Sequence, residues 1–567
     1  MTALPIPTQE RLVELDLSGQ LAEELAAYHD GDAEGSSGFA QACVKAHNDG
    51  RIDLLAAVQQ PAFVALESHK FFAAQQVYCD AIPHLHADVD ALMECCTSLV
   101  RRAGQDLAGS MPYGAFRDWC ANNPDQASRI IDEARAGKDR VKDFVTFALH
   151  GANDIKQAVA FVEEFTDERC LYAMTALGRM IFPDEGAARK VLAVLEPLTG
   201  HSWDDRVRAN ALAASFGILA KHPDLLIARR IVESAGSGPG ADMLYTLAQM
   251  LFQRQVTLDL ETTRIALSAM RLLGKDHPGT VGTLSHALCR MLETPEEVLA
   301  LDALSEMLDC GARSVEDFRT VFHKISSGAA ERRQALAVRW LLSGSVRLGD
   351  AVSELVPHSQ SGWSGLDWAL PLLSDDEQVF LCRKAVAFLF MHPKSCCEVL
   401  VAVLRNASAR VCDVAVDLLV NPMMISYGGL QKYLATVSEA DSAHVHIQVA
   451  LERFVQYRAT LDAISDVKEL RPTERQRHVA RMRSRDEMRE AFKGAERSSV
   501  LQNLFHRSHV LFGRRTLTFI EDLDGTRRAI PLDLNSHSTS IEMPSLEWLD
   551  PVGLDYMLRS WRVMRQP

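Results

Sequence analysis

The residues best placed to do chemistry together are a glutamate and a histidine that lie about one helical repeat apart. Glu398 falls in a helix predicted over residues 395–404, and His444 opens a helix predicted to end near Tyr457. If neighbouring repeats stack, the two side chains meet, and the carboxylate would orient the imidazole and raise its pKa. An enzyme could be built on this pair. The alternative is a salt-bridged pair that only stabilises the fold.

A second group of residues could bind phosphate. Between Lys468 and Arg528 fifteen basic residues stand against nine acidic ones, a local charge of about +6 in a chain whose net charge is −15. A helix is predicted from just after Pro472 to about Glu496, and four of its arginines recur at steps of three or four and share a face. That face could lie along a nucleic-acid backbone or dock on the acidic remainder of the chain, or it could simply be solvated. The candidate nucleic-acid contacts are Arg475, Arg481, Arg485, Arg489, Arg514, Arg515, Arg527 and Arg528.

Two tryptophans stand in a loop rich in Ser and Gly at residues 358–368. Trp is enriched at binding hot spots, so Trp363 and Trp368 are candidate contacts for a protein partner. The alternative is that both rings fold back on the neighbouring repeat.

Metal and cofactor signatures are missing from the sequence. Cys79, His84 and His86 precede the adjacent cysteines at 95 and 96, but this spacing matches no standard zinc module, and adjacent helical residues point about 100° apart. There is no phosphate-binding loop, no H-E-x-x-H, no G-x-S-x-G and no dinucleotide fingerprint. We therefore expect no metal and no cofactor, and an enzyme is the less favoured interpretation.

The elements that must position these residues are helices of one repeated kind. Apolar and small residues recur with helical spacing in the segments 171–178, 209–217, 244–251, 266–274, 335–342, 385–391 and 411–420. Self-similarity at intervals of roughly 30 to 55 residues is typical of stacked helical hairpins. The predicted fold is mainly α, an irregular α-solenoid.

Proline marks where these helices are interrupted. His222, His277 and His392 each precede a proline, which lacks the amide that a continuing helix needs. The alanine-rich helices, the Gly or Pro stops and the short turns resemble HEAT and armadillo repeats over residues 111–461. That resemblance implies stacked inner helices lining a surface that binds another macromolecule.

Glu398 and His444 carry a second resemblance. A Glu and a His in this arrangement resemble the EH-signature proteins of bacterial Zorya anti-phage systems, which accompany membrane motor components and a nuclease or helicase. This resemblance implies a place in antiviral defence, and the basic segment would suit DNA.

The end of the chain has a different pattern. Strands are predicted over 515–520 and 526–532 on either side of Asp524-Gly525, a strong hairpin turn. A last helix over 551–563 places Leu554, Met557, Leu558 and Trp561 on one face. The expected domains are an N-terminal helical cap (1–110), HEAT-like repeats (111–465), and a basic helix with a small α+β module (466–567).

Composition limits the class of protein. Apolar residues make up 47% and charged residues 24% of the chain, as in folded soluble proteins. The 12 cysteines include no C-x-x-C, which favours free thiols in a reducing compartment. We find no secretory signal and no long apolar run, so we expect a cytoplasmic protein without membrane insertion, and the excess of Arg over Lys suggests a bacterial source.

The function predicted from these observations is binding. We expect a non-enzymatic scaffold or adaptor of a bacterial multi-protein system, with a protein partner on the solenoid face. The alternative is a DNA-binding component of an anti-phage system that acts through its basic C-terminal module.

Overall fold

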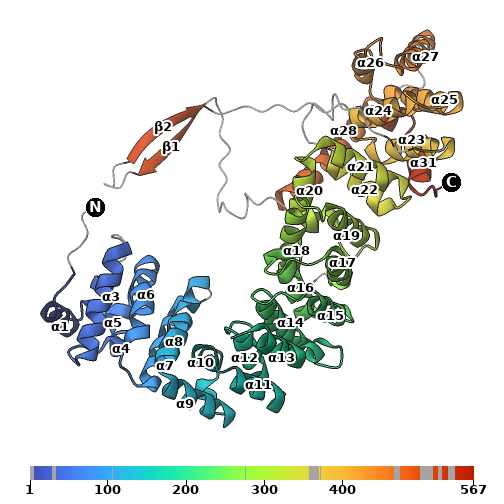
Figure 1. Ribbon diagram of the computed structural model, residues 1–567. Coiled ribbons are helices and arrows are strands. Elements are labelled where there is room, and N and C mark those ends of the chain that lie inside the picture. The colour runs from blue at the N-terminus through green and yellow to red at the C-terminus, as the bar shows by residue number, and fades with distance from the viewer. Residues whose placement is uncertain are drawn as a thin grey trace. The chain divides into compact units, whose positions relative to one another are not determined.

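A computed structural model describes residues 6–27, 33–104, 106–274, 276–356, 370, 372–464, 473–497, 515–521, 527–533 and 543–566. The fold is mainly helical, as the sequence predicts (Figure 1). Contacts divide the chain into two compact units, Met1–Ser327 and Gly328–Pro567. Among the described residues, none of the helices combines the length and the apolar character needed to cross a membrane. The division into 1–110, 111–465 and 466–567 remains a prediction.

The first unit is built of helices joined by short turns. Its helices are α1 (Gln9–Leu17), α2 (Leu21–Ala27), α3 (Ala33–Asn48), α4 (Leu54–Ala57), α5 (Pro61–Val64), α6 (Ser68–Ala81), α7 (Val89–Ala103), α8 (Met111–Asn122), α9 (Pro124–Arg135), α10 (Val145–Ala152), α11 (Ile155–Glu164), α12 (Glu168–Leu177), α13 (Glu185–Leu195), α14 (Asp205–Leu219), α15 (Leu225–Gly236), α16 (Ala241–Gln253), α17 (Leu260–Ala269), α18 (Pro278–Met291), α19 (Glu297–Asp309) and α20 (Arg319–Ser326).

From α8 onwards these helices form two layers (Figure 1). In the even-numbered layer each helix from α8 to α20 packs against the next even-numbered one. The odd-numbered helices pack behind them, α13 and α15 on α14 for example, and α15, α17 and α19 pack in series. The helices of the even-numbered layer bury most of their surface, whereas the odd-numbered ones bury one face. This is a helical-repeat arrangement.

Aspartates cap four helices of the odd-numbered layer. The side chains of Asp154, Asp184, Asp224 and Asp259 each accept a hydrogen bond from a backbone N–H in the first turn of α11, α13, α15 and α17. Such caps satisfy amides that have no partner within the helix. Prolines mark helix starts as well, since α18 and α24 begin with the proline that follows a histidine.

The second unit continues with helices and ends with a strand pair and two more helices. Its elements are α21 (Ala330–Leu342), α22 (Val346–Leu355), α23 (Asp375–Leu389), α24 (Pro393–Leu404), α25 (Ala409–Leu418), η8 (Leu419–Met424), α26 (Leu430–Leu434), α27 (His444–Ala463), α28 (Glu474–Arg497), β1 (Arg515–Glu521), β2 (Arg527–Asp533), α30 (Leu546–Leu549) and α31 (Pro551–Arg562). Helices α21, α23, α25 and α27 pack in series, and α22 and α24 also pack against α23.

The structure describes the two strands predicted near the end of the chain but not the turn predicted between them. Strands β1 and β2 are antiparallel, with Phe519 opposite Ala529, so the predicted hairpin partners are confirmed. The turn at Asp524 lies outside the described residues. Helix α31 packs against α23, and Leu554 is its buried residue.

Candidate functional site

Glu398 lies in α24 with its carboxylate mostly buried. One oxygen, Oε1, accepts a hydrogen bond of 2.7 Å from the hydroxyl of Tyr433, and the other, Oε2, is buried without a hydrogen-bond partner. Burial raises the pKa of Glu398, while the Tyr433 hydroxyl and the positive charge of Lys394 oppose that shift. The Lys394 ammonium lies 5.8 Å from the centre of the Tyr433 ring. A carboxyl in this setting holds a proton more readily than an exposed one does.

His444 makes different contacts. It is the first residue of α27, with Nδ1 3.3 Å from the carbonyl oxygen of Val437 and Nε2 3.3 Å from the Gln448 amide nitrogen. The polar partner of Glu398 is thus a tyrosine, and those of His444 are a carbonyl and an amide. A catalytic role for Glu398 with His444 remains a prediction, which these contacts do not favour.

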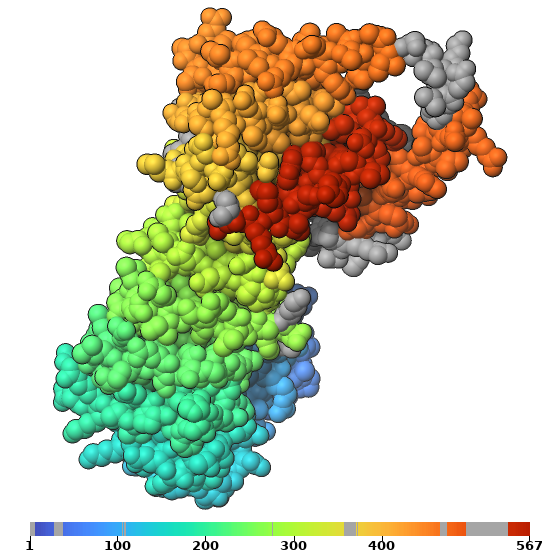
Figure 2. All heavy atoms as spheres, turned by 90° about the vertical axis from the view of Figure 1, so that its right-hand side faces the viewer, coloured from blue at the N-terminus to red at the C-terminus, as the bar shows by residue number. Residues whose placement is uncertain are grey.

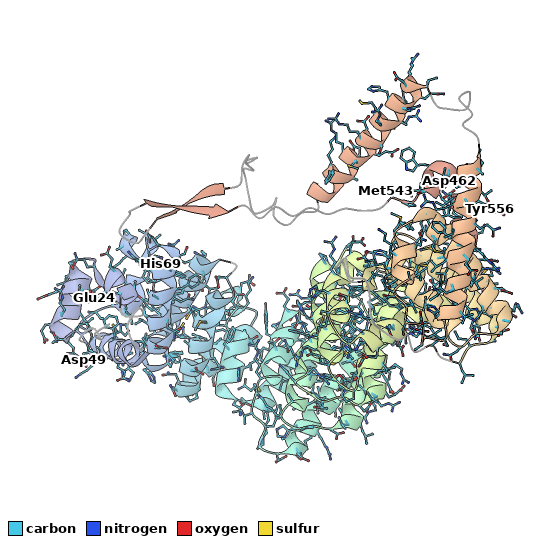
Figure 3. All side chains as sticks on the ribbon, turned by 90° about the horizontal axis from the view of Figure 1, so that it is seen from above. Glu24, Asp49, His69, Asp462, Met543 and Tyr556 are labelled. Carbon is cyan, nitrogen blue, oxygen red and sulfur yellow. The ribbon has the colours of Figure 1, made fainter. Side chains whose placement is uncertain are left out.

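The four arginines predicted to share a face, Arg475, Arg481, Arg485 and Arg489, lie on α28 and are exposed. Side chains project from every side of this helix (Figure 3), and no described helix or strand packs extensively against it. The helix predicted from just after Pro472 to about Glu496 is confirmed by α28, which spans Glu474–Arg497.

The remaining candidates lie on or beyond the strand pair. Arg515, Arg527 and Arg528 are strand residues, opposite Asp533, Glu521 and Ile520 respectively. Arg514 lies outside the described residues, as do both tryptophans of the predicted partner contact, Trp363 and Trp368.

Within the described ranges, no group of three or more His, Cys, Asp or Glu side chains is arranged to hold a metal ion. The cysteines there are free thiols. Burial raises the pKa of Cys43 and Cys95 to about 12, so these thiols stay protonated and unreactive at neutral pH.

Polar bonds between repeats hold the stack in register. Arg208 of α14 is 3% exposed, and its guanidinium donates to the carbonyl oxygens of Thr199, Ala235, Ser237 and Gly238. Thr199 lies between α13 and α14, whereas the other three carbonyls lie in the last turn of α15 and just after it, so one side chain joins two repeats.

The same pattern recurs along the first unit. Asp205 accepts from the backbone N–H of Gly240 and Asp242 at the start of α16, both at 2.8 Å. Lys221 donates to the carbonyl oxygens of Arg179 and Met180, 42 and 41 residues earlier. Bonds across one repeat length fix how consecutive repeats pack.

Between these bonds, helices α12, α14, α16 and α18 of the even-numbered layer each leave one narrow strip open, and the middle of that strip carries no charge. Sequence reasoning did not find it. We call it the uncharged stripe; it consists of Tyr172 and Thr175 on α12, Asn210 and Ala213 on α14, Tyr245, Thr246, Gln249 and Gln253 on α16, and Thr283 and His286 on α18.

Side chains of the uncharged stripe bond to one another. The Thr175 hydroxyl donates to the Asn210 amide oxygen at 3.3 Å, across from α12 to α14. On α16, Gln253 donates to Gln249, which donates to the Tyr245 hydroxyl, at 3.2 and 2.9 Å. A hollow of about 90 Å³ opens between α14 and α16 beside Ala213 and Gln249. The stripe thus combines hydrogen-bonding groups with a shallow depression.

The exposed side of the odd-numbered layer is charged instead. Its cations and anions form ion pairs such as Arg229 with Glu233 at 2.9 Å and Arg230 with Glu196 at 2.7 Å. Arg264 pairs with Glu261 at 2.8 Å in the same manner on α17. Such pairs are typical of a solvated helix face.

A larger cleft of about 360 Å³ lies at the turns before α10 and α12. Lys138, Lys142 and Arg169 line it together with Asp139, Asp167 and Glu168. Arg169 is already engaged, since it donates to both Asp167 oxygens and to the Arg135 carbonyl. The mixed charge selects no single ligand class.

Comparison with known proteins does not assign the chain to a family. No protein-family model matches the chain, and no curated protein matches it significantly.

Proposed function

We propose that this protein is a non-enzymatic α-solenoid scaffold whose first unit binds a protein partner along the uncharged stripe. The observation that carries the proposal is the contrast between the two layers of that unit. The odd-numbered layer presents paired charges, whereas α12, α14, α16 and α18 of the even-numbered layer present mainly Asn, Gln, Thr and Tyr side chains beside a hollow.

The chemistry of the stripe favours a polypeptide over a nucleic acid. Phosphate recognition depends on Lys and Arg, which the middle of the stripe lacks. Amide and hydroxyl groups both donate and accept, so they can pair with the N–H and C=O groups of a bound chain. Tyr172 and Tyr245 add large contact surfaces with few rotatable bonds.

Site-specific photo-crosslinking in the producing cells tests this proposal. A photoreactive residue at Gln249 is expected to form adducts with a defined protein, and the same residue at Arg229, on the odd-numbered layer, is the matched control. Asn210→Arg in the Gln249-labelled chain should remove the adducts. Equal labelling from both positions, or adducts that survive Asn210→Arg, would rule the stripe out as the binding face.

A second candidate function is binding of DNA through α28, in keeping with the resemblance to defence proteins. It is favoured by the exposure of Arg475, Arg481, Arg485 and Arg489 on a helix that no other described element covers extensively. Counterion release predicts that affinity falls steeply with salt when arginines contact phosphates.

Gel-shift titrations with single- and double-stranded DNA at low and physiological salt test this second function. The chain carrying Arg481→Glu, Arg485→Glu and Arg489→Glu should lose the shift and its salt dependence. Arg189→Glu, Arg229→Glu and Arg264→Glu, on the odd-numbered layer, form the control of equal charge change. No shift at low salt, or equal loss in both variants, would exclude DNA binding by α28.

A further inference from the structure

Helix α23 in the second unit carries a buried cation that faces the end of another helix. Lys384 is 0% exposed, and its ammonium donates to the carbonyl oxygen of Arg562, the last residue of α31, at 2.7 Å. The rings of Phe380 and Phe388 flank the ammonium at 5.1 and 5.6 Å from their centres. A cation at a helix C-terminus is favoured by the helix dipole, and aromatic faces add to that attraction.

The contact is reciprocal. Arg562 donates from Nε to the carbonyl oxygen of Ala387 in the last turn of α23, at 3.1 Å, and its guanidinium lies 5.8 Å from the centre of the Phe388 ring. The backbone N–H of Ser545 donates to the Ser426 carbonyl at 2.9 Å and anchors the other end of the segment. Each helix thus donates one side-chain hydrogen bond to a carbonyl oxygen in the last turn of the other.

This site lies on the side of α23 left open by its neighbours in the helical array. Helices α21 and α25 flank α23, and α22 and α24 also pack on it, so α31 covers what remains. Figure 2 shows α31, in red, lying on the surface of the second unit. In the first unit the even-numbered helices keep the corresponding strip open.

Helix α31 is held less firmly than the helices that it covers. Leu554 is its only buried residue, whereas α23 buries ten. Val552 and Tyr556 are 79% and 75% exposed. Figure 3 shows Tyr556 at the surface. Elements with few buried apolar contacts have low free energies of local unfolding, so they detach more often than the core does.

We propose that the face of α23 around Lys384 is a helix-binding site and that α31 is its displaceable occupant, exchangeable with α31 of a second copy of this chain. The second copy is the occupant that fits, because its α31 offers the same terminal carbonyl to Lys384 and the same guanidinium to Ala387. Arg562 lies 178 residues from Lys384 in sequence, so no short turn ties the two together.

Competition within one chain predicts how the site behaves. The tethered α31 is present at a high effective concentration and keeps the site occupied, which lowers the apparent affinity for a free copy. Substitutions that weaken the contact between α31 and α23 within one chain leave the site on α23 free to bind α31 of a second copy. This inference concerns the second unit and is independent of the function proposed for the uncharged stripe.

The test is fluorescence anisotropy of a labelled peptide of residues 543–566 with full-length chains. The chain carrying Leu554→Ala and Arg562→Ala is expected to bind the wild-type peptide at least tenfold more tightly than the wild-type chain does. Adding Lys384→Met to that chain should abolish binding, and a peptide carrying Arg562→Ala should bind weakly to every chain. Equal binding to chains with and without Lys384→Met would place the peptide elsewhere and overturn the proposal.

Hydrogen exchange of the unaltered chain gives a readout that does not depend on the variants. Backbone amides of α31 should exchange at least tenfold faster than those of α23, because α31 detaches while α23 stays folded. If α31 and α23 exchange at the same slow rate as one unit, α31 is a permanent part of the core and the proposal fails.

Discussion

Glu398 illustrates how its surroundings set the behaviour of a single carboxyl group. Burial raises its pKa above the ordinary glutamate value, so the folded state binds a proton more tightly than the unfolded chain does. The contribution of Glu398 to stability is therefore fully present below the unfolded pKa. It declines as the pH rises through the higher pKa of the folded state.

Replacing Glu398 by glutamine removes that titration while keeping an oxygen for the Tyr433 hydroxyl. We expect the free energy of unfolding of the wild-type chain to rise relative to that of Glu398→Gln as the pH falls from 7 towards 4. Urea unfolding at several pH values measures this difference. A difference that is independent of pH, or that changes in the opposite direction, would show that burial does not govern this group.

The enzyme hypothesis is tested at the same position. Glu398→Ala leaves the Tyr433 hydroxyl without its acceptor and should cost about 1 to 3 kcal/mol of stability. An activity lost in Glu398→Ala with an unchanged melting temperature would instead support catalysis by Glu398.

Arg208 is the residue whose loss should matter most in the first unit. Arg208→Ala leaves four carbonyl oxygens, two of them in buried and two in part-buried hydrogen bonds, without their donor, and we expect a loss of about 3 kcal/mol. Arg206→Ala on the same helix is the control, because its ion pair with Glu168 is exposed and worth at most about 1 kcal/mol. Similar losses in both variants, measured by urea unfolding, would contradict the assigned role.

At the scale of elements, close approach of helices depends on glycine. A Cβ atom on Gly178 would lie 2.8 Å from the Cα of Ala214, and one on Gly217 would collide with the Gly178 carbonyl oxygen. Gly178→Ala and Gly217→Ala should each cost about 1 to 3 kcal/mol, because α12 and α14 must move apart.

Gly282 in α18 is the matched control for these substitutions. Nothing lies within 4 Å of an added Cβ there, so Gly282→Ala is expected to stabilise the chain by about 0.5 to 1 kcal/mol through helix propensity. Thermal unfolding compares the three variants, and destabilisation by Gly282→Ala equal to that of the others would contradict the packing argument.

Sequence patterns located elements better than they located contacts. The predicted helix after Pro472, the strand pair and the last helix are confirmed with ends that agree within two residues. The aspartate caps of α15 and α17 were not predicted, although Asp224 and Asp259 each precede an apolar helical run in the sequence. What the pattern could not indicate is that α31 packs against α23.

For the whole molecule, the stacked arrangement predicts that a destabilising substitution affects mainly the helices that lie near it. Each helix of the even-numbered layer touches mainly its neighbours, so stability is approximately a sum of repeat and interface terms. Arg208→Ala should therefore speed hydrogen exchange in α13 to α16 while leaving α23 to α25, in the second unit, unchanged. Uniform acceleration throughout the chain would show that the two units unfold as one.

Periodicity, capping and charge are local properties, so the mainly helical class, the repeated helix pattern and the basic character of α28 can be predicted from the sequence. Which side chains meet depends on how the helices pack. Glu398 pairs with Tyr433 and Lys384 with Arg562, because packing brings together residues that no local pattern links. The uncharged stripe also emerged only from this packing, since a strip of Asn, Gln and Thr becomes a surface when successive helices bury their other sides.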